Sequence, residues 1–335
     1  MSLAAERSAA WRFPAAYRPR PVLLGVLLLL VLALTGPSVE APRMLRMSAE
    51  AVGVAVTGQG ESQVARGLST IARSLWPLQI SERREVSRIE NFDPNHLPPL
   101  SRIEIVERTT QSLDPASLEM VAQVERTQVL VEPAGYLVHV LIKLWETLVI
   151  ALWGTVLAVL ISAPLAYLSA SNLTPHPALY LAARAVVSFL RAAPELVSAL
   201  FLVIAYGFGP IAGVLALALH AAGFLGKFYA EDAESADPRP QEALAAAGAN
   251  RLKVARFAVL PQVLPQYIGY TLYVLDRNFR MATVIGLVGA GGIGQELKGR
   301  FDMYEYHHVG TILAAIFCAV FLIDQVSARL RRRFF

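Results

Sequence analysis

Charged side chains recur at helical spacing inside two segments that are otherwise apolar. The first stripe contains Arg184, Ser188, Arg191 and Glu195, and the second contains Tyr273, Asp276, Arg280 and Thr283 with Arg277 beside it. Residues three and four apart lie on one face of a helix. A guanidinium group binds an oxyanion through paired hydrogen bonds, and it also pairs with a carboxylate four residues away. The stripes therefore predict either a path for anions or ion pairs that set the register of packed helices.

Other kinds of chemistry find little support in the residue pattern. Cys318 is the single cysteine, so a disulfide within the chain or a Cys-based metal site is excluded. His220 is interpreted as a packed helix residue, and no metal-ligand spacing or nucleophile–base arrangement occurs. Gly289, Gly291 and Gly294 fit the pattern GxGxxG, which binds a dinucleotide only after a β-strand and here predicts a turn or close helix packing. We expect no catalytic residue, no metal and no cofactor.

The chain has the composition of a membrane protein. Hydrophobic residues make up 55% of its 335 residues and charged residues 17%, whereas about 25% of an average soluble domain is charged. The apolar residues form long runs, such as 22–34 and 197–206, and a soluble helix would keep a polar face. Many Lys and Arg residues flank these runs, so the net charge of +4 indicates control of membrane topology rather than nucleic-acid binding.

We expect an all-α membrane protein with about six transmembrane helices. After an N-terminal span, the apolar runs predict spans at 136–168, 176–206, 210–230, 265–288 and 308–326. Pro194 is expected to kink the second of these. A basic N-terminus in the cytoplasm places 231–262 and the C-terminus on the same side, and both are rich in Arg. We find no internal repeat, which counts against a secondary transporter.

Three regions follow from this pattern. Residues 1–36 are expected to be a cytoplasmic tail and a transmembrane anchor, and a basic stretch before a short apolar run is also typical of a cleaved signal peptide. Residues 37–135 are predicted to form an extracytoplasmic region. Within it, Asp114-Pro115 predicts the start of a helix over 116–124. Residues 136–335 are expected to form the transmembrane domain.

The predicted cytoplasmic loop at 231–262 carries the most specific pattern in the chain. That pattern consists of Glu242, Ala243, Gly248, Leu260 and Pro261. Residues 241–247 are rich in Ala and predict a short, slim helix, which Gly248 would end in a left-handed conformation. Such a helix can dock into a groove on another protein. An ordinary cytoplasmic amphipathic helix is the alternative interpretation.

The loop resembles the EAA loop of ABC importer permeases, which reads Glu-Ala-Ala, three residues, Gly, nine residues, Ile, one residue, Leu-Pro. Leu244 and Ala258 depart from that pattern, and both keep their positions apolar. The segment 281–294 further resembles permeases of the phosphonate family, although methionine and glycine-betaine permeases share a Gly-rich segment here. The resemblance covers 136–333 and does not extend to 79–131.

The resemblance implies the membrane-spanning permease subunit of an ATP-driven importer, a multi-pass protein of the bacterial inner membrane. It implies the helix bundle of type I importers, similar to methionine permeases. It also implies that the chain is not an enzyme, because a separate ATPase dimer hydrolyses ATP and docks on the loop. A periplasmic substrate-binding protein and a second permease copy or a close paralogue would complete the complex in the lipid bilayer. The implied substrate is a phosphonate, phosphite or phosphate ester.

On this interpretation the polar stripes line the translocation path. The candidate residues are Arg184, Arg191, Glu195, Asp276, Arg277 and Arg280. Ion pairs between helices are the alternative role for the same residues. Three other functions stay open: a methionine or glycine-betaine permease, a secondary transporter that needs no ATPase, and a membrane-anchored signalling protein that uses 37–135 as its sensor.

Overall fold

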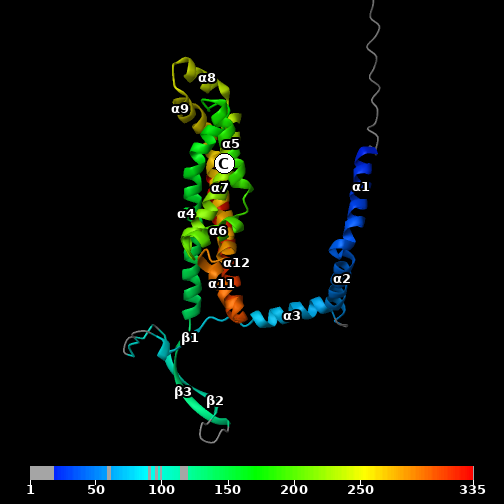
Figure 1. The fold of residues 1–335 in the computed structure, drawn as a ribbon, viewed down its shortest axis with the longest axis vertical. Helices are drawn as coiled ribbons and strands as arrows, with labels where there is room; N and C mark the ends of the chain where they lie inside the picture. The colour runs from blue at the N-terminus through cyan, green and yellow to red at the C-terminus, as the bar shows by residue number, and fades with distance from the viewer. Residues whose placement is uncertain are drawn as a thin grey trace, which may run out of the picture. The chain divides into compact units, whose positions relative to one another are not determined.

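The computed structural model of the chain describes residues 19–58, 62–89, 92–94, 97–98, 100–113 and 120–334. Most of these residues are helical, as the sequence predicts (Figure 1). The chain divides into two compact units, Met1–Arg73 and Ser74–Phe335, and each is described by itself.

The described part of the first unit is mostly helical. Helix α1 (Pro19–Thr35) is almost wholly apolar and continues into a 3₁₀ turn, η1 (Gly36–Val39). Glu40 adopts a left-handed conformation (φ 52°), and α2 (Ala41–Thr57) begins after it. Helix α3 (Gln63–Leu75) starts in this unit and ends just inside the second.

The second unit begins with a small antiparallel sheet that the sequence analysis did not predict. Its described strands are β1 (Glu82–Glu85), β2 (Arg102–Leu113) and β3 (Met120–Glu132), in the order β1-β3-β2, and a 3₁₀ turn, η2 (Val86–Arg88), follows β1. The helix predicted over 116–124 is wrong for 120–124, which lie in β3, while 116–119 fall outside the described residues. Pairing with β2 along its whole length outweighs the local Asp-Pro signal, because strand pairing depends on cross-strand neighbours.

A helical bundle follows the sheet. Its elements are α4 (Gly135–Ser169), α5 (Pro177–Ala192), α6 (Glu195–Tyr206), α7 (Pro210–Ser235), α8 (Pro238–Ala246), α9 (Arg251–Val254), the π-helix η3 (Ala255–Val259), α10 (Leu260–Gly286), α11 (Gly292–Asp302) and α12 (Tyr306–Phe334). Below, the end of the bundle that carries α8 is called the α8 end, and the end where α4 begins and α11 lies is called the α11 end (Figure 1).

The described helices are compatible with about six membrane crossings. Among them, α4, α7 and α12 are each long and apolar enough to cross a bilayer, and counting each of two bent helix pairs as one span raises the number to five. Helix α10 has 27 residues but carries several charged and amide side chains, so its length rather than its hydropathy fits a span. The predicted kink at Pro194 is a full break, because α5 and α6 differ in direction by 89°.

Small side chains place α7 at the centre of the bundle, where it packs against α4, α5, α6 and α10. A Cβ atom added to Gly223 would lie 2.7 Å from the backbone nitrogen of Arg191 in α5, so this close approach requires glycine. On the outside, Trp145, Trp153 and Phe317 are more than half exposed. Such a surface suits contact with lipid rather than water.

Glycines also turn the chain between α10 and α11. Gly289, Gly291 and Gly292 have φ angles of 93°, 85° and 70°, which side chains with a Cβ atom rarely adopt. The GxGxxG pattern therefore occupies a turn at the end of a long helix, and α10, not a strand, precedes it.

Candidate functional site

The loop at the α8 end starts with a capped helix. The carboxylate of Asp237 accepts a hydrogen bond from the backbone nitrogen of Arg239 (3.0 Å), and Pro238 occupies the first position of α8. Both features favour a helix start at this point, because one satisfies a free N–H group and the other removes one. None of the described residues of α8 is buried, so Glu242 and Ala243 lie on an open surface.

Gly248 ends this helix in the conformation that the sequence predicts. Its φ angle is 79°. Its N–H donates to the carbonyl of Ala245 (3.0 Å), and the N–H of Ala249 donates to the carbonyl of Leu244 (3.0 Å). These two bonds form a Schellman motif, which fixes where the helix stops. A Cβ atom at Gly248 would have no neighbour within 4 Å, so the backbone angle alone favours glycine here.

Leu260 and Pro261 begin the long helix α10, directly after α9 and the π-helix η3. Asn250 caps α9 by accepting a hydrogen bond from the nitrogen of Lys253 (2.9 Å), and the π-helix at Ala255–Val259 follows. A π-helix inside a helical run is uncommon and frequently accompanies functional sites. Leu260 is 39% exposed and Pro261 is also exposed, so both contribute to the open surface of the loop.

The loop is tied to the connection between α4 and α5. The side-chain amide of Asn172 donates to the carbonyl of Ala233 (2.8 Å) and to Oε1 of Gln241 (3.1 Å). Arg251 donates to the carbonyl of Thr174. The bonded residues are about sixty to eighty positions apart in the chain. These bonds therefore hold the two connections together, so that they move as one.

Arg184 belongs to this linkage. Its guanidinium forms a two-pronged contact with both carboxylate oxygens of Glu234 (2.9 Å each) and donates to the carbonyl of Ser169 (3.1 Å). Glu234 also accepts from the backbone nitrogen of Ser171 (2.8 Å). The first predicted stripe is therefore divided, because Arg184 joins α5 to α7 at the α8 end.

Glu195 and Arg277 meet at the break between α5 and α6. Arg277 donates through Nη2 to Oε1 of Glu195, and the same nitrogen lies 3.0 Å from Nε2 of His220. His220 contacts the carbonyl of Ala193 through Nδ1 (3.0 Å). Because a carbonyl accepts, Nδ1 carries the hydrogen, and Nε2 is left to accept from Arg277. We call Glu195, His220 and Arg277 the break cluster.

The break cluster is largely buried and retains one free donor. The side chains of Glu195, His220 and Arg277 are 12%, 13% and 24% exposed. Nη1 of Arg277 is buried and has no hydrogen-bond partner among the described residues. A buried donor without a partner is costly and demands an explanation. Phe224 lies beside it, with its ring centre 5.9 Å from the guanidinium carbon.

The remaining stripe residues are arranged unequally. Arg280 pairs with Asp276 on the same helix (2.7 Å), and the two side chains are 45% and 6% exposed. The structure forms no ion pair between Arg191 and Glu195, although they are four residues apart, because the helix breaks between them and Glu195 turns to Arg277. Arg191 is partly exposed near the end of α5.

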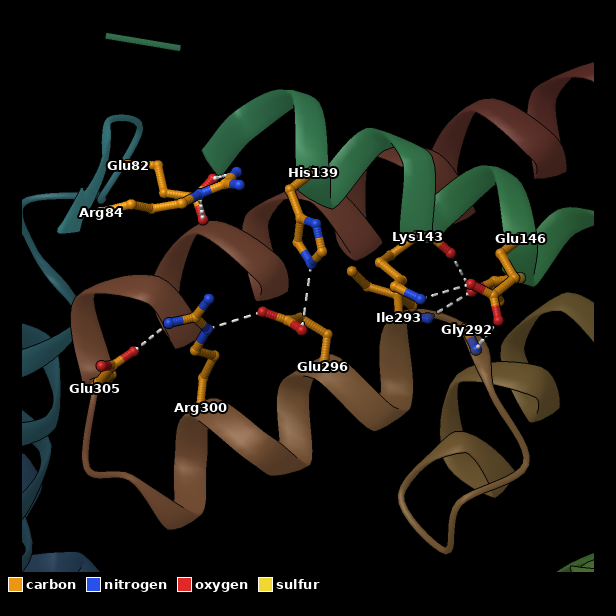
Figure 2. A network of polar contacts seen from close by, with 11 residues as sticks. Glu82, Arg84, His139, Lys143, Glu146, Gly292, Ile293, Glu296, Arg300 and Glu305 are labelled. Carbon is orange, nitrogen blue, oxygen red and sulfur yellow. Dashed lines mark hydrogen bonds and ion pairs between the residues drawn. The ribbon is translucent and has the colours of Figure 1, made fainter. Parts of the chain in front are cut away.

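The α11 end contains a second polar network (Figure 2). Glu146 accepts from the backbone nitrogen of Gly292 (3.0 Å), and Thr147 accepts from that of Ile293 (2.8 Å). Both acceptors lie on α4 and meet the N-terminus of α11, where free N–H groups and the helix dipole favour an anion. Lys143 pairs with Glu146 (2.8 Å). These contacts fix α11 against α4.

Glu296 links the same helices further along (Figure 2). It pairs with Arg300 (2.8 Å) and with His139 of α4 (3.3 Å), and Arg300 also pairs with Glu305 (2.6 Å). Burial by itself raises the pKa of Glu296. The hydrogen bonds and charges of Arg300 and His139 lower it by more, so the pKa lies below its usual value. The contact with His139 joins α11 to α4, and we call these three ion pairs the clasp at Glu296.

Several of these residues were not predicted from the sequence. Asn172, Glu234 and Thr174 carry no local signal, because their partners lie far along the chain. His220 does carry one, since an ionisable residue inside an apolar run is a functional candidate. No group of three His, Cys, Asp or Glu side chains is placed to hold a metal ion in the described ranges.

A family model matches the bundle. The model described as "Binding-protein-dependent transport system inner membrane component" matches residues 162–334. That range includes the loop at the α8 end, the break cluster and α11.

Individual relatives agree with this family. HtxE of Stutzerimonas stutzeri, assigned as the permease of a phosphite transport system, is 56% identical over 77% of this chain and 99% of its own length. The phosphate-import permease protein PhnE of Mycolicibacterium smegmatis is 43% identical over 56% of this chain and 35% of its own.

A solved structure of the MetNI methionine ABC transporter in an inward-facing conformation shares the fold. Its matched chain has a TM-score of 0.52 and 22% identity, covering 58% of this chain and 96% of that one. The expected methionine-permease-like bundle is thereby confirmed. The chain belongs to the family of binding-protein-dependent inner-membrane transport components: it is a multi-pass permease subunit of an ABC importer, and ATP hydrolysis belongs to a separate ATPase.

Proposed function

We propose that this permease moves phosphite, or a closely related phosphonate or phosphate ester, into the cell. The observation that carries the proposal is the 56% identity to a phosphite permease over 99% of that protein's length. A methionine permease shares the fold at 22% identity, which is a likeness of architecture alone. A single fold hosts many substrates, so the proposal depends on the residues that would meet the anion.

The break cluster supplies those residues. Phosphite is a tetrahedral oxyanion, and its oxygens offer a guanidinium the same contact that the carboxylate of Glu195 makes now. The free Nη1 of Arg277 provides a second donor for a bidentate contact. Arg280, 45% exposed, lies one helical turn beyond Asp276 and is paired with it. An anion therefore exchanges with Glu195 at Arg277 as it passes the break.

The loop at the α8 end is the proposed contact with the ATPase. The exposed positions Glu242 and Ala243 and the fixed end at Gly248 form a short helix that fits a groove. Asn172, Arg184 and Arg251 join this loop to the α4–α5 connection. A movement of α8 is thereby transmitted to α4 and α5, and through α5 toward the break cluster.

The complete importer needs further subunits. Two permease copies, or this chain with a close paralogue, would present two α8 helices to an ATPase dimer. In this arrangement 1–36 anchor the chain, 37–135 lie outside the cytoplasm, and 136–335 form the translocating domain with its cytoplasmic coupling loop at 231–262. A periplasmic binding protein delivers the anion to the α11 end.

Uptake by the reconstituted importer tests the proposal. Proteoliposomes with the permease, its ATPase and its binding protein should accumulate labelled phosphite only with ATP, and methionine and glycine betaine should not compete. The Arg277→Ala variant should lose most uptake. Arg277→Lys should keep part of it, because lysine retains the positive charge but lacks the paired donors with which a guanidinium binds an oxyanion. Arg102→Ala, on the exposed strand β2, is the matched control. Competition by methionine, or uptake without ATP, would contradict the proposal.

A further inference from the structure

Helix α1 and the turn η1 are together long enough to cross a membrane. Their 17 and four residues extend about 33 Å at the helical rises of 1.5 and 2.0 Å per residue, and a hydrocarbon core is about 30 Å thick. Leu23, Leu28 and Leu34 are at least 60% exposed, as expected for side chains that face lipid. The chain therefore reaches the membrane surface close to Glu40.

Helix α2 turns away from that direction. The axis of Ala41–Thr57 makes an angle of 78° with that of Leu23–Val39. Transmembrane helices tilt by about 20° on average from the bilayer normal. A helix at nearly a right angle to α1 consequently runs close to the plane of the membrane, at the level where α1 emerges.

The two faces of α2 differ in polarity. Leu45, Val52 and Val56 are spaced by seven and four residues and lie on one face, where they are 66%, 63% and 81% exposed. Arg46 and Glu50, four residues apart, lie on a different side of the helix, about a third of a turn away from this face. None of the described residues of α2 is buried, so nothing in the described chain covers its apolar face.

Helix α3 repeats the arrangement. Val64, Leu68 and Ile71 follow at spacings of four and three, and Leu68 and Ile71 are 61% and 55% exposed. Arg66 and Arg73 lie on the other side of the helix, seven residues apart. Two successive helices thus present an apolar face and a charged side directly after α1.

We propose that α2 and α3 lie in the outer surface of the bilayer, with their apolar faces in the boundary between headgroups and acyl chains. The occupant of these faces is phospholipid. The covalent link to α1 holds both helices at the membrane, the 78° turn sets α2 along it, and the arginines on the polar faces match the phosphates of the headgroups. This placement is independent of the substrate and of the ATPase.

Site-specific fluorescence in the assembled importer tests the proposal. A Cys318→Ser background receives single cysteines at Leu45, Val52, Leu68 and Ile71 on the apolar faces, or at Arg46, Glu50, Thr70 and Arg73 on the polar faces. Each is labelled with an environment-sensitive dye and reconstituted into vesicles of phosphatidylethanolamine and phosphatidylglycerol. Brominated lipids and aqueous iodide serve as quenchers. Leu28→Cys in α1 is the lipid reference, and Glu104→Cys in β2 is the aqueous reference.

Labels on the apolar faces should be quenched by brominated lipid, as the label at position 28 in the span is. Labels on the polar faces should match position 104 and respond to iodide instead. The pattern should therefore alternate with the helical period along both helices. Labels at Leu68 and Ile71 that are shielded from both quenchers would show that another protein surface covers α3. Equal quenching by iodide on both faces would place the helices in water, and either result overturns the proposal.

Discussion

The side-chain amide of Asn172 donates to Oε1 of Gln241 across 3.1 Å, and this bond joins the α4–α5 connection to the first turn of α8. The two residues are 69 positions apart. Both belong to exposed loops, which would otherwise move independently.

Loss of this bond should uncouple ATP hydrolysis from transport. In Asn172→Ala the two loops lose about 1 kcal/mol of mutual stabilisation, so ATP turnover should continue while phosphite uptake per ATP falls. Gln241→Ala should give a similar loss, and the double variant should add little to either. Ser235→Ala is the control, because its hydroxyl bonds only within α7. Strictly additive losses would show that the two side chains do not act together.

A side chain at Gly248 should weaken the contact with the ATPase. Gly248→Val forces a β-branched residue into a left-handed conformation, which costs about 1–2 kcal/mol and loosens the end of α8. Co-purification of the ATPase should drop, whereas Gly248→Asn should retain most of it because Asn tolerates this conformation. If the valine variant carries the ATPase as well as the native chain does, the helix end has no role in docking.

Removing only one charge of the Glu195–Arg277 pair should destabilise the permease more than removing both. Glu195→Gln leaves a mostly buried guanidinium without its counter-charge, and breaking a buried pair in this way costs about 3–5 kcal/mol. The double variant Glu195→Gln with Arg277→Gln removes both charges and should unfold at a higher temperature than Glu195→Gln alone. Thermal unfolding of the detergent-purified permease measures the difference. Equal melting temperatures for these two variants would mean that the charges do not depend on each other.

Close packing of α7 on α5 should make Gly223 sensitive to a single methyl group. In Gly223→Ala the new Cβ atom lies 2.7 Å from the backbone of Arg191, so the helices must separate and the melting temperature should fall. Gly299→Ala is the matched control in α11, where a Cβ atom meets nothing within 4 Å. There the substitution should raise helix stability by up to about 1 kcal/mol. Equal effects of the two changes would remove the packing explanation.

Acid should loosen the clasp at Glu296. Its pKa is lower in the folded chain than the ordinary value of 4.5, so its ion pairs stabilise the fold fully above that value. The stabilisation is lost as the pH falls through the lower folded pKa, where the carboxylate is protonated. A melting-temperature profile between pH 6 and pH 3 should therefore decline more steeply for the native chain than for Glu296→Gln. Parallel profiles would exclude Glu296 as the titrating group.

The sequence predicted the features that depend on local physics. Long apolar runs specify helices that lipid can surround, and the positive φ required after an Ala-rich helix explains why Gly248 ends α8. Other features depend on distant partners. The sheet at 82–132 is formed by pairing between separate strands, so Asp114-Pro115 gave a misleading helix signal. The partners of Arg184 and Glu195 could not be derived either, because Glu234 and Arg277 lie 50 and 82 positions away.

On the proposed translocation path, the break cluster also affects how long an anion stays. Glu195 already balances the charge of Arg277, so the pair by itself carries no net charge. An anion that takes the place of Glu195 at Arg277 would leave the cluster, with Glu195 still charged, in excess negative charge, which a region of low polarity accommodates poorly. On the proposed path, transient occupancy is therefore the expected outcome, and departure needs no separate ejecting group. A permease that must release its cargo in every cycle gains more from such a weak site than from a tight one.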